Sequence, residues 1–172
     1  SEVVNGVKYW ELHAFSSELN KTTNIATLKD VDGLFFEKGI PTLKILAPSA
    51  FWKMDKKEIH LTEPLGYDIK YEKTLSKKLR EIKNFKGLIS IFHLPSKAPY
   101  PTELGYWFKA RALNWSLATK RIICRGGITL TKGNVTVFSK NLEADVGLKR
   151  VRLTGEPKAT VLTDSKKINI SA

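Results

Sequence analysis

Residues 43–61 read LKILAPSAFWKMDKKEIHL, and apolar side chains alternate with polar ones on both sides of a central polar stretch. The alternating apolar residues are Leu43, Ile45, Ala47, Ile59 and Leu61. A period of two places such side chains on one face of a β-strand. Residues 55–57, DKK, favour a turn. The segment therefore predicts two short strands that are joined by a turn.

The same unit recurs along the chain, which makes four copies in all. About 63 residues later its register returns in Tyr106, Phe108, Ala110, Trp115, Lys120, Ile122 and Cys124. About 29 residues further on it returns in Val135, Val137, Ser139, Ala144, Lys149, Val151 and Leu153. A weaker copy precedes them in Trp10, Leu12, Ala14, Leu19, Asn24, Ala26 and Leu28. One unit cannot bury its own apolar face but stacked units can, so we expect roughly a dozen antiparallel strands in a curved or folded-over sheet.

The alternating positions of all four copies should share the concave face of this sheet. These positions are Trp10, Leu12, Ala14, Leu43, Ile45, Ala47, Ile59, Leu61, Tyr106, Phe108, Ala110, Ile122, Val135, Val137, Val151 and Leu153. The chain is expected to form one elongated domain over residues 1–172, with a first half at 1–70, an insertion or linker at 71–103 and a second half at 104–172. Within the insertion, a short amphipathic helix around residues 75–82 and a hairpin around residues 88–92 both fit the pattern.

Composition narrows the possible functions. The net charge is +12, which favours anionic partners such as phosphorylated lipid, an acidic membrane surface or nucleic acid. Cys124 is the only cysteine, so an internal disulfide framework and a Cys-rich zinc site are excluded. The three histidines lack the close paired spacing of a metal motif, and no nucleophile elbow occurs in the sequence. We therefore expect no enzyme activity, no metal and no cofactor.

Several segments resemble the LptC family and the wider LptA- and LptC-like group of β-jellyroll proteins in lipopolysaccharide transport. These segments are residues 10–14 (WELHA), 28–31 (LKDV), 43–61, 110–153 and 155–159 (GEPKA). The resemblance implies a V-shaped β-jellyroll with an apolar groove in the periplasm. It also implies that an amino-terminal helix outside this sequence anchors the protein to the inner membrane.

The resemblance further implies a non-enzymatic carrier that receives lipopolysaccharide from an inner-membrane ABC transporter and passes it to an LptA-like bridge protein. The residues implied to line the lipid groove are Trp10, Leu12, Leu43, Ile45, Ile59, Leu61, Tyr106, Phe108, Ile122, Val135, Val137, Val151 and Leu153. Basic residues at turns are either solvated or placed to contact lipid phosphate, and these are Lys57, Lys120, Lys149 and Arg150. The last predicted strand carries no proline after Pro157, so it is expected to form the edge that docks the bridge protein through Ala159, Val161 and Leu162.

Two functions from other classes also fit the sequence. A nucleic-acid-binding module is consistent with the high positive charge and the interleaved aromatic residues. However, the lysines are spread over the chain, and no RNA-recognition or oligonucleotide-binding signature is present. A polysaccharide-binding β module is the other alternative.

Overall fold

The computed structural model describes residues 1–69, 106–145, 150–162 and 167–171, and these form one antiparallel sheet of twelve strands. The strands are β1 (Glu2–Val4), β2 (Val7–Asn20), β3 (Ile25–Glu37), β4 (Ile40–Lys53), β5 (Glu58–Thr62), β6 (Leu65–Asp68), β7 (Tyr106–Ser116), β8 (Arg121–Lys132), β9 (Val135–Asp145), β10 (Val151–Thr154), β11 (Lys158–Leu162) and β12 (Lys167–Ser171). The all-β antiparallel fold predicted from the sequence is confirmed. The helix and the hairpin considered for the insertion lie outside the described residues.

The order of the strands in the sheet follows their order in the chain, from β1 at one edge to β12 at the other. Two neighbouring strands, β5 and β6, lie end to end between β4 and β7, so together they act as one interrupted strand. In the same way, β10 and β11 both pair with β9. The hairpins β2–β3, β4–β5, β7–β8 and β9–β10 correspond to the four sequence repeats.

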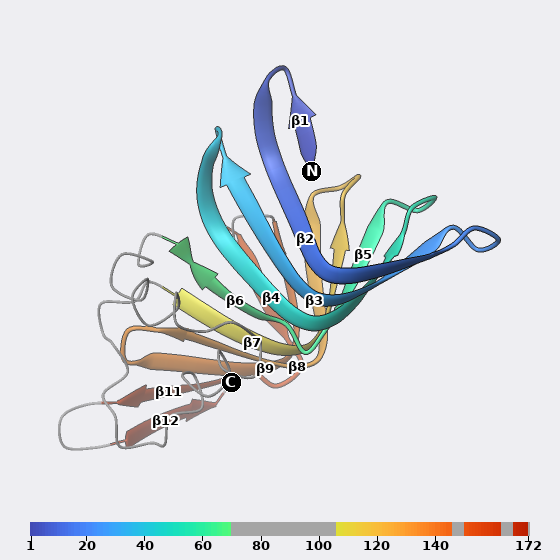
Figure 1. The fold of residues 1–172 in the computed structure, drawn as a ribbon. Helices are drawn as coiled ribbons and strands as arrows, with labels where there is room; N and C mark the ends of the chain where they lie inside the picture. The colour runs from blue at the N-terminus through green and yellow to red at the C-terminus, as the bar shows by residue number, and fades with distance from the viewer. Residues whose placement is uncertain (70–105, 146–149, 163–166, 172) are drawn as a thin grey trace.

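A line of irregular backbone crosses the sheet at one level, and we call it the crease. It passes through Phe15, Asp30, Pro48, Glu63, Arg111, Gly126, Gly127, Lys140 and Glu156. The register of β8 against β9 shifts between Arg125 and Ile128, which makes the Gly126-Gly127 pair a β-bulge. Both glycines have positive φ values, 80° and 115°, which side chains with a Cβ rarely adopt. The strands therefore bend together along one line (Figure 1).

The crease divides the sheet into two wings that face each other. The turn wing comprises residues 16–29, 49–62, 112–125, 141–145 and 150–154, and the terminal wing comprises the other described strand residues. Aromatic side chains from the two wings meet between them. The Trp115 ring of the turn wing lies 5.1 Å from the Trp10 ring and 4.3 Å from the Phe35 ring, both of the terminal wing. These contacts confirm the folded-over sheet and place the core between the wings.

One prediction about the carboxy-terminal end is wrong. The strand that carries Ala159, Val161 and Leu162 is not the edge of the sheet, because β11 pairs with β9 on one side and with β12 on the other. The sequence reasoning missed β12, whose short alternation at Ile168 and Ile170 follows a segment rich in polar residues. Among the strands that the structure describes, the edge at this end is therefore β12. No helix among the described residues is long and apolar enough to cross a membrane.

Candidate functional site

The inner face of the terminal wing carries a row of apolar residues that runs across nearly all of its strands. The cross-strand register places in this row Leu12, Gly33, Ile45, Gly66, Phe108, Leu130, Val137, Ala159 and Ile170. The residues Ile45, Phe108 and Val137, which occupy equivalent positions in three repeats, are therefore members of one row. Equal hairpin geometry in the repeats keeps the register, and the period of two then keeps the side chains on the same face.

Burial changes along this row. Ile45 and Phe108 are only 1% and 2% exposed, whereas Leu130 and Val137 are half-buried and Ile170 is 56% exposed. The ring of Phe108 lies directly over Gly66, so that a methyl group added at Gly66 would overlap it. The space between the wings is thus closed by side chains in the middle of the sheet and opens toward the carboxy-terminal strands.

The facing rows of the turn wing show the same distribution. One row contains Leu19, Ala26, Trp52, Ile59, Trp115, Ile122, Ala144 and Val151. Ile59 and Ile122 in its middle are completely buried, and Leu19 and Val151 at its two ends are 47% and 38% exposed. The interior of the folded sheet is therefore a packed core in the middle and an apolar surface at its ends.

The residues implied to line a lipid groove divide between these regions. Those in the packed core are Trp10, Leu43, Ile45, Ile59, Leu61, Phe108 and Ile122. Those that are half-buried beside it are Leu12, Tyr106, Val135, Val137 and Leu153, and Val151 is exposed. All of them lie on the inner face, as the alternation predicts. Their contact with lipid stays a prediction.

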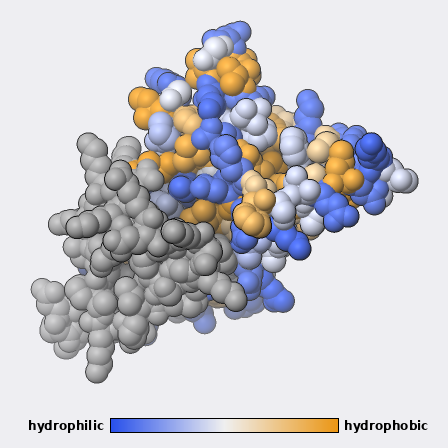
Figure 2. Space-filling view, in the orientation of Figure 1, coloured by the Kyte–Doolittle hydropathy of each residue, from blue (hydrophilic) through white to orange (hydrophobic). Residues whose placement is uncertain are grey.

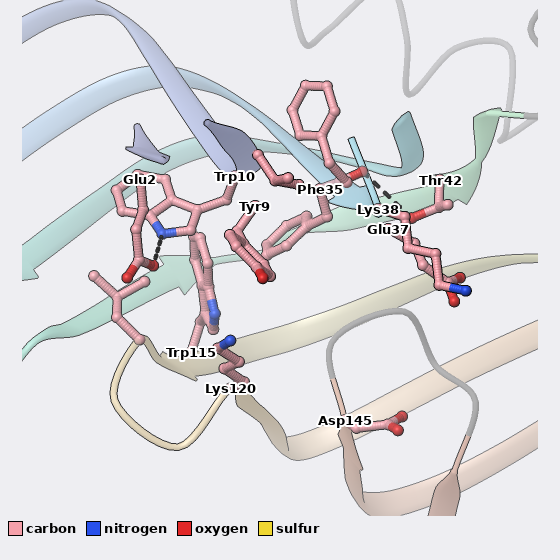
Figure 3. Close-up of a pocket in the computed structure, with 13 residues that line it drawn as sticks. Glu2, Tyr9, Trp10, Phe35, Glu37, Lys38, Thr42, Trp115, Lys120 and Asp145 are labelled. Carbon is pink, nitrogen blue, oxygen red and sulfur yellow. Dashed lines mark hydrogen bonds between the residues drawn. The ribbon is translucent and has the colours of Figure 1, made fainter. Parts of the chain in front are cut away.

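A cavity of about 560 Å³ opens between the wings beside the tips of β1–β4 and the turn between β7 and β8 (Figure 3). It is lined by Glu2, Val7, Tyr9, Trp10, Phe35, Phe36, Glu37, Lys38, Thr42, Trp115, Leu117, Lys120 and Asp145. Its inner wall is aromatic, because Trp10, Phe35 and Trp115 pack against one another there. This volume lies within the usual range for small-molecule sites, about 300–1,000 Å³.

Polar contacts hold the wall of the cavity in place. The indole Nε1 of Trp10 donates a hydrogen bond to the Glu2 carboxylate at 2.9 Å, which ties β1 to the cavity. The Lys120 ammonium lies 4.3 Å from the centre of the Tyr9 ring and so bridges the two wings by a cation–π contact. The two lysines of the lining, Lys38 and Lys120, are exposed at the rim. The site therefore combines an aromatic interior with a charged rim.

Sequence reasoning found only part of this cavity. Of the implied lipid-groove set it contains Trp10, and of the basic turn residues it contains Lys120. Lys57 and Arg150 are exposed away from the lining, and Lys149 lies outside the described residues. Phe35 was missed because β3 belongs to the weakest repeat, although its alternation of Val31, Gly33 and Phe35 could have placed it on the inner face.

The titratable groups of the interior are held in their neutral forms. Burial raises the pKa of the Cys124 thiol to about 12. Burial, with a smaller contribution from the charge of Asp68, raises the pKa of Tyr106 to about 12. A thiol protonated at neutral pH is a weak nucleophile and a poor metal ligand. Among the described residues there is also no cluster of three or more side chains that could hold a metal ion.

Comparisons with known proteins add a likeness of fold. No family model matches the sequence, and no curated protein matches it significantly. Among solved structures, the chain is similar to LptH from Pseudomonas aeruginosa, the LptA-homologous periplasmic component of the conserved lipopolysaccharide transport device. The TM-score is 0.52 at 11% identity, over 94% of this chain and 93% of LptH. The likeness supports the LptA- and LptC-like group of folds and does not distinguish LptC within it. The chain therefore has an LptA-like β-jellyroll fold.

Proposed function

We propose that this chain is a periplasmic lipid carrier that binds lipopolysaccharide between the two wings of its sheet. In the finer form of the proposal it acts as LptC does, receiving the lipid from an inner-membrane ABC transporter and passing it to an LptA-like bridge protein. An amino-terminal helix outside this sequence would anchor it to the inner membrane. The support is the shared fold with LptH, whose description names lipopolysaccharide transport, together with the chemistry of the cavity.

The observation that carries the proposal is the cavity of about 560 Å³ with its aromatic wall and its rim lysines. Acyl chains gain about 0.8 kcal/mol for each methylene group that leaves water, so an aromatic and aliphatic wall attracts them. The phosphate groups of the same lipid stay in water and interact with cations, and Lys38 and Lys120 are placed at the rim for that contact. An amphipathic molecule fits both parts of the site, and its phosphates would face Lys38 and Lys120 on a rim that also carries the Glu2, Glu37 and Asp145 carboxylates.

The filled middle of the sheet determines how a long acyl chain would enter. Ile59 and Ile122 leave no space there. An acyl chain would therefore enter at the cavity and displace side chains that hold the two wings together. The aromatic cluster of Trp10, Phe35 and Trp115 is the part of that contact nearest to the cavity. In this scheme the wings move apart by bending at the crease, where the regular hydrogen-bond ladder of the sheet is already interrupted. Transfer requires no covalent step from this protein.

Photocrosslinking in cells tests the binding site directly. A photoreactive phenylalanine replaces Leu117, which is half-buried in the lining of the cavity, and a matched control carries it at Phe51, which is 39% exposed on the outer face. We expect the Leu117 variant to form a crosslink with lipopolysaccharide and the Phe51 variant to form none. Equal crosslinking at both positions, or crosslinking at Phe51 alone, would contradict the proposed site.

The edges of the sheet are the proposed sites of handover. The edge strand β12 and the part of β2 beyond Glu11, which β1 does not cover, both present backbone groups without a neighbouring strand among the described residues. Such edges accept a strand from another protein. Docking of an LptA-like bridge on β12 would extend the inner face of this sheet, because Ile170 ends its apolar row. A pull-down of the bridge with a chain that ends before β12 tests this, and undiminished capture would place the docking edge elsewhere.

A further inference from the structure

The hairpin turns of the turn wing project beyond one end of the sheet in a single line. The turns are aligned because the residues that flank each turn all lie in one cross-strand row. That row consists of Asn20, Ile25, Lys53, Glu58, Ser116, Arg121 and Asp145. We call the described residues of this end, 20–25, 53–58, 116–121, 145 and 150, the turn ledge.

Backbone hydrogen bonds join the turns of the ledge to one another. The amide of Met54 donates to the carbonyl of Asn24 at 3.2 Å, and the amide of Leu117 donates to the carbonyl of Lys57 at 2.9 Å. Asn24, Lys57 and Lys120 occupy the last position of their turns with φ values of 54°, 52° and 56°. Three successive turns therefore have the same conformation and are fixed relative to one another. The backbone positions that carry the side chains are therefore held in one line.

The ledge is strongly basic. Its cations are Lys21, Lys53, Lys56, Lys57, Lys120 and Arg121, together with Arg150 at the last turn, and its carboxylates are Asp55, Glu58 and Asp145. The cations exceed the carboxylates by four, and one of the cations, Arg121, is paired with Glu143 outside the ledge.

In the described part of the chain, no carboxylate lies within ion-pair distance of Lys21, Lys56 or Lys57. All three lysines are exposed. Figure 2 shows blue, hydrophilic residues and near-white residues at the protruding tip of the β2–β3 hairpin, with orange, hydrophobic residues beside them. The described ledge therefore carries a net positive charge, to which Lys21, Lys56 and Lys57 contribute without an ion-pair partner among the described residues.

Apolar side chains lie directly behind these cations. Leu19 is 47% exposed, and Met54 and Leu117 are half-buried at the end of the core. The cavity opens at the same end, because Leu117 and Lys120 belong to both the ledge and the cavity lining. A line of fixed cations with apolar residues behind it matches the surface of a bilayer, where phosphate groups lie above acyl chains.

We propose that the turn ledge docks this protein onto the surface of an anionic membrane. The occupant is the phosphate-bearing headgroup layer of a bilayer, and docking would turn the mouth of the cavity toward the lipid. A duplex nucleic acid offers the same charge but nothing for the apolar residues behind the ledge to contact. The inference goes beyond the proposed lipid carrier function and does not depend on it, since the tested lysines, Lys21, Lys56 and Lys57, lie outside the cavity lining.

Vesicle flotation with the isolated chain tests the proposal. The probes are phosphatidylcholine vesicles that contain phosphatidylglycerol and vesicles of phosphatidylcholine alone. We expect binding to the first only, weakened by salt because the contact is electrostatic. The test variant is Lys21→Gln/Lys56→Gln/Lys57→Gln. Each cation near an anionic surface contributes roughly fivefold to binding, so this variant should bind on the order of 100-fold more weakly.

A matched control distinguishes the effect of the ledge lysines from the effect of net charge on vesicle binding. The variant Arg125→Gln/Lys132→Gln/Lys158→Gln removes the same number of exposed cations from other parts of the sheet. It should bind anionic vesicles within a few-fold of the original chain, and circular dichroism should show that both variants are folded. Equal losses in the two variants would show that net charge alone acts, and this result would overturn the proposal.

Two further results would also overturn it. One is the absence of vesicle binding by the original chain while a short DNA duplex binds and depends on Lys21, Lys56 and Lys57. The other is displacement from vesicles by inorganic phosphate well beyond that caused by sodium chloride at equal ionic strength, which would indicate a site for a free anion. Because the vesicles contain no lipopolysaccharide, failure here leaves the crosslinking test of the cavity unaffected.

Discussion

The substitution Gly66→Ala tests the apolar row of the terminal wing at its tightest point. Gly66 lies beneath the ring of Phe108, which is 2% exposed, and an added methyl group would overlap two atoms of that ring and crowd a third. The ring cannot move away freely, because buried side chains surround it and protein interiors are closely packed. The substitution therefore forces a shift of the ring or of the backbone.

The size of the effect follows from two opposing contributions. Overpacking in a core costs about 1–3 kcal/mol. Replacing glycine by alanine also restricts the unfolded chain, which returns about 0.4–1 kcal/mol where the backbone accepts a side chain. Gly66 does not have a positive φ, so the second contribution applies. We expect the free energy of unfolding to fall by about 1–2 kcal/mol.

Urea denaturation followed by tryptophan fluorescence measures this change. Gly33→Ala is the matched control, because Gly33 lies in the same row but its added methyl group would meet only the end of the Leu12 side chain, at 3.2 Å. The control should change the stability by less than about 1 kcal/mol. In a Phe108→Leu background the cost of Gly66→Ala should largely disappear, which a double-mutant cycle detects. An equal cost in both backgrounds would refute the contact between Gly66 and the ring.

Three other predictions follow from burial and pairing. Phe108→Asp should lose about 3–5 kcal/mol of stability in urea denaturation, because an unpaired carboxylate would replace a core ring, whereas Phe51→Asp on the exposed outer face should change little. Cys124 should react with iodoacetamide at pH 8 far more slowly in the folded protein than in urea. Its pKa rises from 9.0 to about 12 on folding. The contribution of this thiol to the free energy of unfolding is therefore full below pH 9 and is lost as the pH rises toward 12. Rapid labelling of the folded chain would contradict the burial of this thiol. Val161→Pro should lower the thermal midpoint and cost about 3 kcal/mol, because β11 is paired on both sides; an unchanged midpoint would mean that β12 does not cover it.

The residues of the inner face can be predicted from the sequence because they follow from the alternation of side chains within each strand. Ile45, Phe108 and Val137 occupy the same position in three repeats, and the cross-strand register keeps them in one row. Lys120 occupies a turn position of its repeat in the same way. Period-two patterns therefore predict which side chains share the inner face.

The packing of the two wings against each other cannot be predicted from this alternation. The period of Ile59 and Leu61 resumes at Leu65 and Tyr67, although the strand is interrupted at Glu63 and Pro64 and resumes as β6. Which inner-face residues become core and which line the cavity depends on the angle at the crease, and that angle is set by contacts between Trp10, Phe35 and Trp115, from three distant segments. Long-range packing of this kind lies beyond a reading of neighbouring residues.

The agreement between chain order and strand order has a consequence for how such a protein can change over evolutionary time. Since each hairpin pairs with the hairpins beside it in sequence, the duplication or loss of one repeat would lengthen or shorten the sheet without rethreading the chain. The crease would be inherited with each copy, because every repeat carries its own irregular position at that level. The length of the apolar interior, and with it the size of molecule that it can cover, is therefore a quantity that whole-repeat duplication can adjust in discrete steps.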